Sequence, residues 1–519
     1  MSSDRVSSTC GDSACKDRLF HKPGLIYFWI VNDECEPEVM NRMGKAFVDA
    51  SASAVVLHAR AGLRVPYGGT DWFDMIEQTV EDCADRDLRV WLYDEDPFPS
   101  GAAGGRVFIE RPEFEAREIQ CYTYGQQEQV LNVDGGEEFA EYEHEPMEGL
   151  FCFPAGTLLW CGLVNQETGE TVDLTGKVGT VRRQWKILRE WDSRYYYPDT
   201  PLYEHPRAMT QKPEYALRVP DVPPEMDLLA CVARPTGRGS VYGGLPDTLN
   251  PEATEYFLKL THERYLECVG DHFGDEIRAI FTDEPKMPST YPYTRGMFEN
   301  FEKKYGYDLK PRLCDLFCAE DRLTERARLT RLHYREWCGE QFEKAWLSPV
   351  GDWCEEHDIR LVGHISPEDD PVEQSKNLGS LFPLFKHFAL PGIDLIIPAV
   401  GDHRHPLINV GILSATGAAA QLDKPGVLSE SLACGGVDPD MEKARTILVW
   451  QTMMGMTTPV VHAALNSTEG LREIEAPPDY GPRSPHWETM QEIQDEIKPI
   501  QDVVRRGIQV APVAVVWPI

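Results

Sequence analysis

The chain has 519 residues, more than the ~250–300 that usually share one hydrophobic core, so it forms either one elaborated domain or several. Its 85 acidic residues against 51 basic ones give a net charge of -34, which repels phosphate backbones and anionic membrane surfaces and excludes nucleic acid and membranes as expected partners. The 34 arginines and 17 lysines make the chain acidic and lysine-poor, as in halophilic proteins, although an ordinary acidic enzyme can share this balance.

The N-terminal segment 1–22 is predicted to be a disordered tail. It is polar, without the apolar region or cleavage-site pattern of a secretory signal, and no run of about 18 apolar residues elsewhere predicts a transmembrane helix. The 14 cysteines are scattered through predicted helices and strands, which favours free thiols in a reducing, cytoplasmic compartment. Cys314 and Cys318 have no second pair or nearby histidine to complete a zinc site.

From Pro23 onward, apolar strand-like runs alternate with amphipathic helical ones, and this alternation predicts parallel strands with helical crossovers. The eight predicted strands are Leu25–Val31, Ala54–His58, Arg89–Tyr93, Ile277–Phe281, Arg360–His364, Ile393–Pro398, Gly426–Ser429 and Pro459–His462. Predicted helices include Asp71–Arg86, Pro251–His272, Thr324–His357, Pro439–Met454 and Pro485–Arg505. Eight such units predict an α/β fold, a (β/α)8 TIM barrel over residues 23–507, with its active site at the carboxyl ends of the strands.

Two segments do not fit a simple barrel. The connection between Tyr93 and Pro251 is far too long for one crossover, and its Gly-rich turns and short β-like pieces predict a β-rich insertion over residues 106–225, after the third strand. Residues 508–519 read as a fresh buried strand, which we interpret as the start of a truncated C-terminal domain, absent or separately encoded. If that domain is separately encoded, we expect a partner protein that carries the missing C-terminal domains.

Two strand ends carry the strongest chemical signal. Phe281-Thr282-Asp283-Glu284-Pro285 brings two carboxylates to the end of an apolar strand, which Pro285 then stops. The run Gly426-Val427-Leu428-Ser429-Glu430-Ser431 repeats the pattern with a lone glutamate. Two carboxylates at one rim of a barrel indicate glycoside hydrolysis, with Glu284 and Glu430 as the catalytic candidates.

Other ionisable or polar residues gather at the same predicted rim and are candidates for binding sugar hydroxyls, which need groups that donate and accept hydrogen bonds. These substrate-binding candidates are His58, Arg60, Tyr93, Asp94, Glu95, Asp283, His364, Glu368 and His462. Taken singly, each carboxylate could instead cap a helix or form an ion pair, and each histidine could be a satisfied core residue.

Metal sites receive weaker support from the sequence. The cluster Asp94-Glu95-Asp96 offers oxygen ligands for Ca²⁺ but lacks the spacing of a calcium loop. A metal-dependent barrel hydrolase would need His-x-His after the first strand, where this chain has Val31-Asn32. The prediction is therefore of no catalytic metal and no certain cofactor, with Ca²⁺ as the candidate ion.

Several dense motifs resemble the family 106 α-L-rhamnosidases, a group of large bacterial TIM-barrel glycoside hydrolases. They are Trp91–Gly101 with Ala103–Gly105, Leu249–Ala253, Thr261–Glu263, Phe281–Pro285 and Tyr305–Asp308, within a resemblance that covers about residues 23–519. The resemblance implies a glycosidase barrel normally followed by β-sandwich domains. The carboxylates after strands four and seven are also similar in position to the acid/base and nucleophile of retaining barrel glycosidases, whereas family 106 enzymes are thought to invert.

These observations predict an exo-acting glycoside hydrolase that removes a terminal sugar from a glycoside or oligosaccharide. Glu284 would be the general acid, with a pKa raised by burial and by Asp283, and Glu430 the nucleophile or the base for water. Rhamnose-like deoxysugars are the first expected substrates and β-galactosides the second; retention or inversion depends on the separation of the two carboxyls. The alternative is a non-catalytic carbohydrate-binding or scaffold barrel left after loss of accessory domains.

Overall fold

The computed structural model describes residues 22–125, 140–143, 149–190, 207–237, 239–320, 323–368, 370–396, 410–507, 510–511 and 513. The predicted tail up to residue 21, residues 397–398 of the sixth predicted strand, and most of the predicted strand 508–519 lie outside these described residues. The chain divides into two compact units. The first contains residues 1–107, 251–286 and 342–519, and the second contains residues 108–250 and 287–341.

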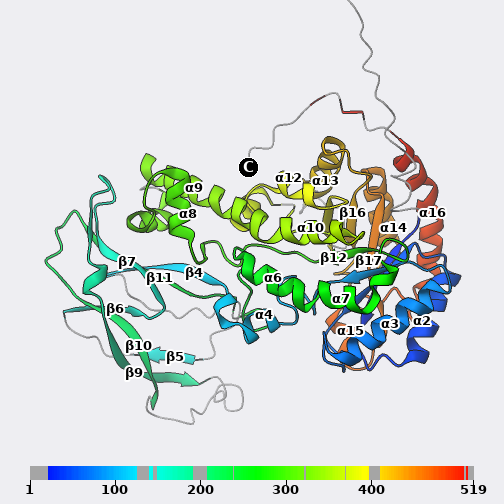
Figure 1. Ribbon diagram of the computed structural model, residues 1–519, viewed down its shortest axis with the longest axis horizontal. Coiled ribbons are helices and arrows are strands. Elements are labelled where there is room, and N and C mark those ends of the chain that lie inside the picture. The colour runs from blue at the N-terminus through cyan, green and yellow to red at the C-terminus, as the bar shows by residue number, and fades with distance from the viewer. Residues whose placement is uncertain are drawn as a thin grey trace, which may run out of the picture. The chain divides into compact units, whose positions relative to one another are not determined.

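The first unit is built on eight parallel strands that form a near-closed barrel; β12, β16 and β17 are labelled in Figure 1. The strand order is β14-β12-β3-β2-β1-β17-β16-β15. The strands are β1 (Ile26–Val31), β2 (Ala54–Ala59), β3 (Val90–Tyr93), β12 (Ile277–Thr282), β14 (Arg360–Gly363), β15 (Gly392–Leu395), β16 (Leu428–Ser431) and β17 (Thr458–Leu465). Every residue of β1 and β2 is buried, as expected when the barrel core covers one face of a strand and helices cover the other. The predicted (β/α)8 fold is confirmed.

Strand β16 differs from its predicted bounds in a way that matters for the site. It was expected over Gly426–Ser429 but begins at Leu428, because the N–H of Val427 donates to the Thr457 hydroxyl instead of a ladder carbonyl (3.0 Å). The strand then continues to Ser431, so Glu430 lies within it and not after it.

Two glycines allow the backbones of β12, β14 and β15 to approach one another closely. A Cβ at Gly363, at the end of β14, would lie 1.9 Å from the Thr282 carbonyl oxygen of β12. A Cβ at Gly392, at the start of β15, would lie 1.7 Å from the Gly363 carbonyl oxygen. These separations are far below van der Waals contact, so only glycine fits at either position.

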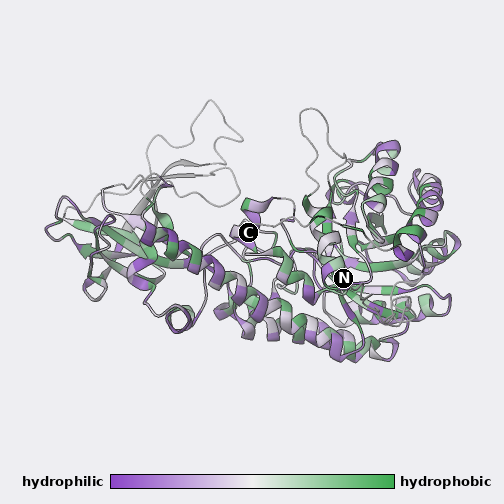
Figure 2. Cartoon of the chain, turned by 90° about the horizontal axis from the view of Figure 1, so that it is seen from above, coloured by the Kyte–Doolittle hydropathy of each residue, from purple (hydrophilic) through white to green (hydrophobic). Residues whose placement is uncertain are grey.

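Helices with one apolar stripe and one polar face accompany the strands, as their mixed colouring shows (Figure 2). In the first unit they are α2 (Pro37–Asp49), α3 (Thr70–Ala84), α6 (Pro251–Leu260), α7 (His262–Val269), η3 (Gly270–His272), the π-helix η6 (Glu343–Leu347), α10 (Ser348–Glu356), α11 (Pro371–Asn377), α12 (Leu381–Leu384), η7 (Phe385–His387), α13 (Val410–Gln421), α14 (Met441–Met453), α15 (Arg472–Glu475) and α16 (Trp487–Arg506), and α4 (Arg106–Glu110) begins in this unit. None of the helices in the described residues is long and apolar enough to cross a membrane.

Two predicted helices are interrupted. The helix expected over Pro251–His272 breaks at Thr261, which has non-helical backbone angles and whose hydroxyl donates to the Phe257 carbonyl (2.9 Å). The helix expected over Thr324–His357 widens into η6 and restarts as α10, where Pro349 lacks the N–H that a continuous helix needs.

The second unit contains two antiparallel sheets inserted after β3, as predicted. One has the order β5-β9-β10-β6 and the other β13-β4-β11-β7-β8. The strands are β4 (Arg117–Thr123), β5 (Ala140–Glu143), β6 (Leu150–Pro154), β7 (Thr157–Val164), β8 (Thr171–Asp173), β9 (Gly179–Glu190), β10 (Arg207–Arg218), β11 (Asp227–Pro235) and β13 (Pro292–Tyr293), and the helices are η1 (Pro112–Phe114), η2 (Thr175–Lys177), α8 (Met297–Tyr305), η4 (Lys310–Phe317) and α9 (Glu325–Phe342). The unit extends beyond the predicted 106–225 because β11 and β13 both pair with β4.

Candidate active site

The predicted rim residues lie on several strands of the first unit, at or near their carboxyl ends. Tyr93 ends β3, Asp283 follows β12, His364 follows β14, and Glu430 lies in β16. All four side chains belong to buried residues. The barrel core next to these residues is apolar: the Phe28 ring contacts Phe281, with ring centroids 4.9 Å apart.

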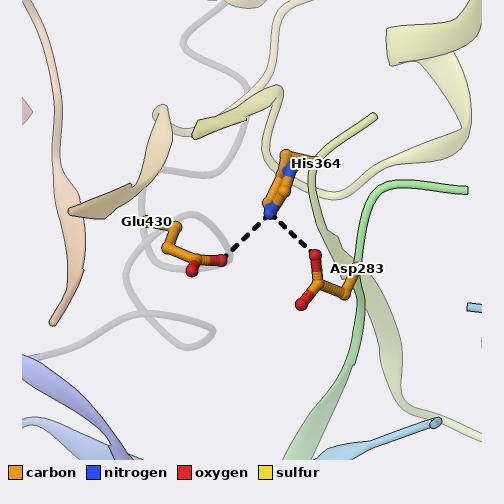
Figure 3. A group of neighbouring side chains, drawn as sticks. All are labelled: Asp283, His364 and Glu430. Carbon is orange, nitrogen blue, oxygen red and sulfur yellow. Dashed lines mark hydrogen bonds and ion pairs between the residues drawn. The ribbon is translucent and has the colours of Figure 1, made fainter. Parts of the chain in front are cut away.

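His364 lies between two carboxylates (Figure 3). Its Nε2 is 3.2 Å from Asp283 Oδ1 and 3.0 Å from Glu430 Oε2, and its Nδ1 is 3.4 Å from a third carboxylate, Glu368 Oε1. Asp283 and Glu430, which are 147 positions apart in the sequence, thus share one imidazole nitrogen. Of the two carboxylates at the end of β12, it is Asp283 that joins this cluster.

The pKa values of this cluster are shifted in different directions. Burial alone would lower the pKa of His364, but hydrogen bonds to Asp283, Glu368 and Glu430 outweigh burial and raise it well above its usual value. Burial would raise the pKa of Asp283, but hydrogen bonds from His364 and Tyr93 lower it to about 2. Burial and the charge of Asp283 raise the pKa of Glu430 to about 7. The imidazole is therefore protonated and Asp283 ionised at neutral pH.

Tyr93 and Ser100 hold Asp283 in place. The Tyr93 hydroxyl donates to Asp283 Oδ2 (2.5 Å), and burial raises the pKa of Tyr93 well above its usual value, so the phenol stays protonated. Ser100 Oγ accepts from the Asp283 N–H (2.8 Å) and donates to Asp94 Oδ1 (2.5 Å). The Ser100 N–H donates in turn to the Asp283 carbonyl (2.8 Å).

Glu95 occupies a different environment from the other rim carboxylates. Its two oxygens accept hydrogen bonds from five backbone N–H groups, those of Asp96, Gly101, Ala102, Ala103 and Gly104, at 2.6–3.0 Å. Burial raises the pKa of Glu95 to about 7, while these donors favour the ionised form. Its neighbour Asp94 is fully buried, and burial raises its pKa well above the usual value.

His58, Arg60 and His462 form a second group at the rim. His58 Nδ1 lies 2.7 Å from the Ala59 carbonyl, to which it donates, so Nε2 is free to accept from Arg60 Nη1 (3.4 Å). Burial and the Arg60 charge lower the pKa of His58 well below its usual value and that of His462 to about 3. Both histidines are therefore neutral. The His58 ring stacks on Tyr93, with centroids 3.7 Å apart, which links this group to Asp283.

Glu284 has the least enclosed position of the predicted catalytic residues. Its side chain is 19% exposed, its backbone φ is 37°, and Oε1 lies 3.5 Å from Lys286 Nζ. The expected burial of Glu284 is therefore only partial. Its carboxylate is therefore accessible to a bound molecule without the loss of buried hydrogen bonds.

Sequence reasoning missed Asp394 and Ser100. Asp394 pairs in register with Glu430 across β15 and β16, and its N–H donates to Glu368 Oε1 (3.0 Å). Burial and the Glu430 charge raise the pKa of Asp394 well above its usual value, and its Oδ1 is buried with no hydrogen-bond partner among the described residues. An aspartate inside an apolar strand was the signal available for Asp394, whereas nothing in the local sequence distinguishes Ser100.

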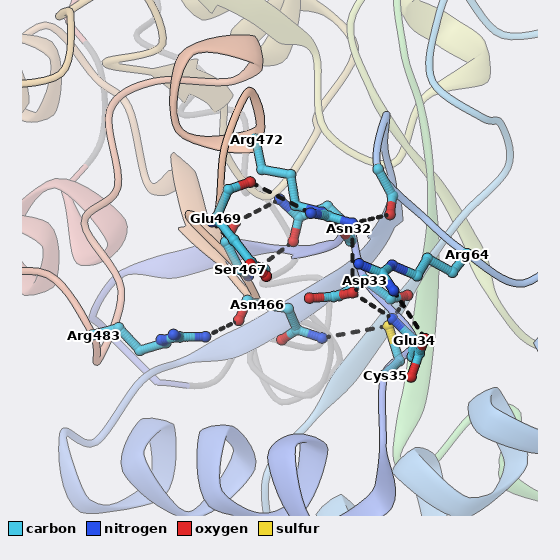
Figure 4. A network of polar contacts seen from close by, with 11 residues as sticks. Asn32, Asp33, Glu34, Cys35, Arg64, Asn466, Ser467, Glu469, Arg472 and Arg483 are labelled. Carbon is cyan, nitrogen blue, oxygen red and sulfur yellow. Dashed lines mark hydrogen bonds and ion pairs between the residues drawn. The ribbon is translucent and has the colours of Figure 1, made fainter.

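A polar network also fixes the rim next to β1 and β17 (Figure 4). The Asn32 side chain donates to the Ser467 carbonyl and accepts from the Ser467 N–H, both at 2.9 Å. Arg472 donates to the carbonyls of Asn32 (2.5 Å) and Gly62 (3.2 Å), and Arg483 donates to the Asn466 carbonyl. These bonds join loops that are distant in the sequence and hold the strand ends at fixed spacing.

Within the described part of the chain, one group of side chains has the geometry to hold a metal ion. Single ligand atoms of Asp283, His364 and Glu430 lie within 4.8 Å of one another. A mixed nitrogen and oxygen set suits a transition metal better than Ca²⁺, which takes six to eight oxygens. Any ion here would have to replace the proton that His364 Nε2 shares with the two carboxylates. At the other candidate position, the Glu95 oxygens already accept five N–H groups, an arrangement that does not fit a cation.

Comparison with known proteins gives a likeness of fold. No family model matches the sequence, and no curated protein matches it either. Among solved structures, a rhamnosidase from Novosphingobium sp. PP1Y superposes with a TM-score of 0.58 at 12% sequence identity. The match covers 95% of this chain and 60% of the rhamnosidase chain. The chain is therefore similar in fold to this rhamnosidase, and spans about three fifths of that protein's length.

Proposed function

We propose that the protein is a glycoside hydrolase that removes a terminal sugar, with Glu430 and Glu284 as its two catalytic carboxylates. The observation that carries the proposal is the Glu430 environment: a buried carboxylate 3.0 Å from a protonated His364, at the end of a barrel whose fold resembles a rhamnosidase. A buried carboxylate with a pKa of about 7 is typical of an active site.

In this mechanism Glu430 acts in its ionised form, as nucleophile or as the base for water, and Glu284 protonates the glycosidic oxygen. His364 supports the ionised form of Glu430, because an imidazolium at hydrogen-bond distance favours the carboxylate. Asp283 keeps His364 protonated, and Tyr93 fixes Asp283. Because Glu284 is partly exposed, its carboxylate is accessible to the glycosidic oxygen of a substrate that binds from solvent.

The remaining rim residues divide into two roles in this proposal. His58, Arg60, Asp94, His462 and Asp394 contact sugar hydroxyls. The Oδ1 of Asp394, which has no hydrogen-bond partner among the described residues, would gain one from the substrate. Glu368 holds His364 through Nδ1, and Glu95 holds the loop 96–104. α-L-Rhamnosides are the first proposed substrates, in line with the fold likeness, and β-galactosides the second.

A panel of nitrophenyl glycosides tests the proposal. Wild-type protein should hydrolyse at least one of them, and Glu430→Gln and Glu284→Gln should each lower kcat at least about a hundredfold with an unchanged circular dichroism spectrum. Asp495→Asn, on α16 and 77% exposed, is the matched control that removes a carboxylate elsewhere and should leave kcat unchanged. Near-normal turnover by either glutamine variant would end its assignment, and no hydrolysis of any glycoside would favour a binding barrel.

Azide addition then separates the two stereochemical outcomes. If Glu430 is a nucleophile, azide should restore turnover of an activated substrate by a Glu430 variant and give a glycosyl azide of opposite anomeric configuration. If Glu430 activates water in an inverting enzyme, this product is not required.

A further inference from the structure

Two cysteines lie opposite each other on neighbouring strands of the five-stranded sheet in the second unit. Strands β4 and β11 pair antiparallel without a register shift, from Arg117 opposite Pro235 to Thr123 opposite Leu229. In this register Cys121 lies directly opposite Cys231. The two thiols are 110 positions apart in the sequence, and both are free.

The backbone hydrogen bonds show which kind of pair the cysteines form. At one end of the ladder the Thr236 N–H donates to the Ala116 carbonyl, and at the other the Tyr124 N–H donates to the Leu228 carbonyl. Hydrogen-bonded and non-hydrogen-bonded pairs alternate along an antiparallel ladder, so the hydrogen-bonded positions of β4 are the even-numbered ones. Cys121 therefore stands at a non-hydrogen-bonded pair, where side chains approach most closely.

This position fits the geometry of a disulfide. Opposed Cα atoms of a non-hydrogen-bonded pair are about 4.5 Å apart. Disulfides span Cα separations of roughly 4.4–6.8 Å. The register is therefore compatible with a bond between the two sulfurs.

The two thiols differ in their access to solvent and in reactivity. Cys121 is half-buried and Cys231 fully buried. A hydrogen bond with Cys121, together with burial, raises the pKa of Cys231 well above its usual value, which makes Cys231 a poor first nucleophile. Cys121 is thus the thiol that an oxidant meets first, and Cys231 is the thiol placed to resolve the product.

We propose that Cys121 and Cys231 are a redox modification site that forms a reversible cross-strand disulfide when the protein meets a peroxide. The Cys121 sulfur attacks the peroxide O–O bond, becomes a sulfenic acid and releases one water. Cys231 then attacks that sulfur, the S–S bond forms, and the hydroxyl leaves as a second water. Two thiols lose two electrons and two protons in total, and the peroxide is reduced to two waters. The proposal is independent of glycoside hydrolysis.

Peptide mapping after hydrogen peroxide treatment tests the site. We would use a Cys434→Ser background, because Cys434 is exposed and would otherwise form links between molecules. After alkylation of the remaining thiols under denaturing conditions, we expect a linked peptide pair containing Cys121 and Cys231, about two mass units lighter than the two thiol peptides, that dithiothreitol separates. Alkylation of both cysteines, or linkage of Cys121 to neighbouring Cys314, would overturn the proposal.

Unfolding gives a second readout that needs no peptide analysis. Since the bond would close a long loop in the unfolded chain, oxidised protein should unfold at a higher urea concentration than reduced protein. Cys121→Ser and Cys231→Ser should each abolish the shift, whereas Cys83→Ser, which removes a buried thiol on α3, should leave it intact. An equal shift in all variants would assign the effect to other thiols and refute the pair.

Discussion

His364 decides the charge of the candidate active site through its contacts with three carboxylates. With the imidazole protonated and Asp283 ionised, these two charges compensate each other in a buried position. Glu430 is the remaining partner of the same nitrogen, so among these three groups it is the one whose protonation changes near neutral pH. The residue at which the proposed chemistry occurs therefore also titrates near neutral pH.

The pH dependence of kcat/KM follows from the state that Glu430 needs. Its pKa is raised to about 7, and the proposed role requires the ionised form, so activity should be lost as pH falls through about 7. Below the pKa, we expect kcat/KM to drop about tenfold per pH unit. A pH series on the best nitrophenyl substrate measures this limb, and the residual activity of Glu430→Gln should lack it. Full activity well below pH 7, with loss only above it, would give Glu430 the acid role and reverse the assignment.

Strand β14 lies close to β12 and β15 lies close to β14 at positions that are occupied by glycines, Gly363 and Gly392. Side chains at Gly363 or Gly392 would collide with backbone oxygens, which cannot swing away as a flexible side chain can. The same backbone leads directly into His364, the residue after Gly363. The close approach of the strands at Gly363 therefore also helps to position the His364 imidazole.

Alanine substitutions test this close approach. Gly363→Ala and Gly392→Ala should each destabilise the protein by at least about 2 kcal/mol, through overpacking at both sites and the positive φ of Gly363 (120°). Gly417→Ala is the matched control, because it lies in helix α13 with its nearest neighbour atom 4.0 Å from the added Cβ. That control should be neutral or slightly stabilising. Thermal melts of the three variants measure these effects. Equal melting temperatures in all three would show that Gly363 and Gly392 are not required for close backbone contact.

At the scale of the whole molecule, the net charge of -34 opposes the compact state through self-repulsion. Salt screens this repulsion, since the Debye length falls from about 10 Å at 0.1 M to about 3 Å at 1 M. We expect the melting temperature to rise between 0.1 and 1 M KCl. A flat or falling melting temperature would remove the halophilic interpretation, while the proposed activity would be unaffected.

The eight strands and the insertion after the third were predictable because they depend on local patterns. Continuous apolar runs such as Ile26–Val31 are typical of parallel strands that are buried on both faces. The connection after Tyr93 is too long for a simple crossover, which indicates an insertion. Strand and helix ends were less predictable, because they depend on single contacts. The Thr457 hydroxyl that delays β16 comes from another part of the chain.

The sequence by itself therefore determined the barrel and the kinds of side chain at its rim, since strand periodicity and the direction of parallel strands fix which residues reach one end. Only the tertiary structure decided their partners and proton states. It brought Asp283 and not Glu284 to His364, surrounded Glu95 with backbone N–H groups, and set Asp394 beside Glu430. Distances of a few ångströms between residues far apart in the chain, together with the loss of water, set these pKa values, and no local pattern encodes either.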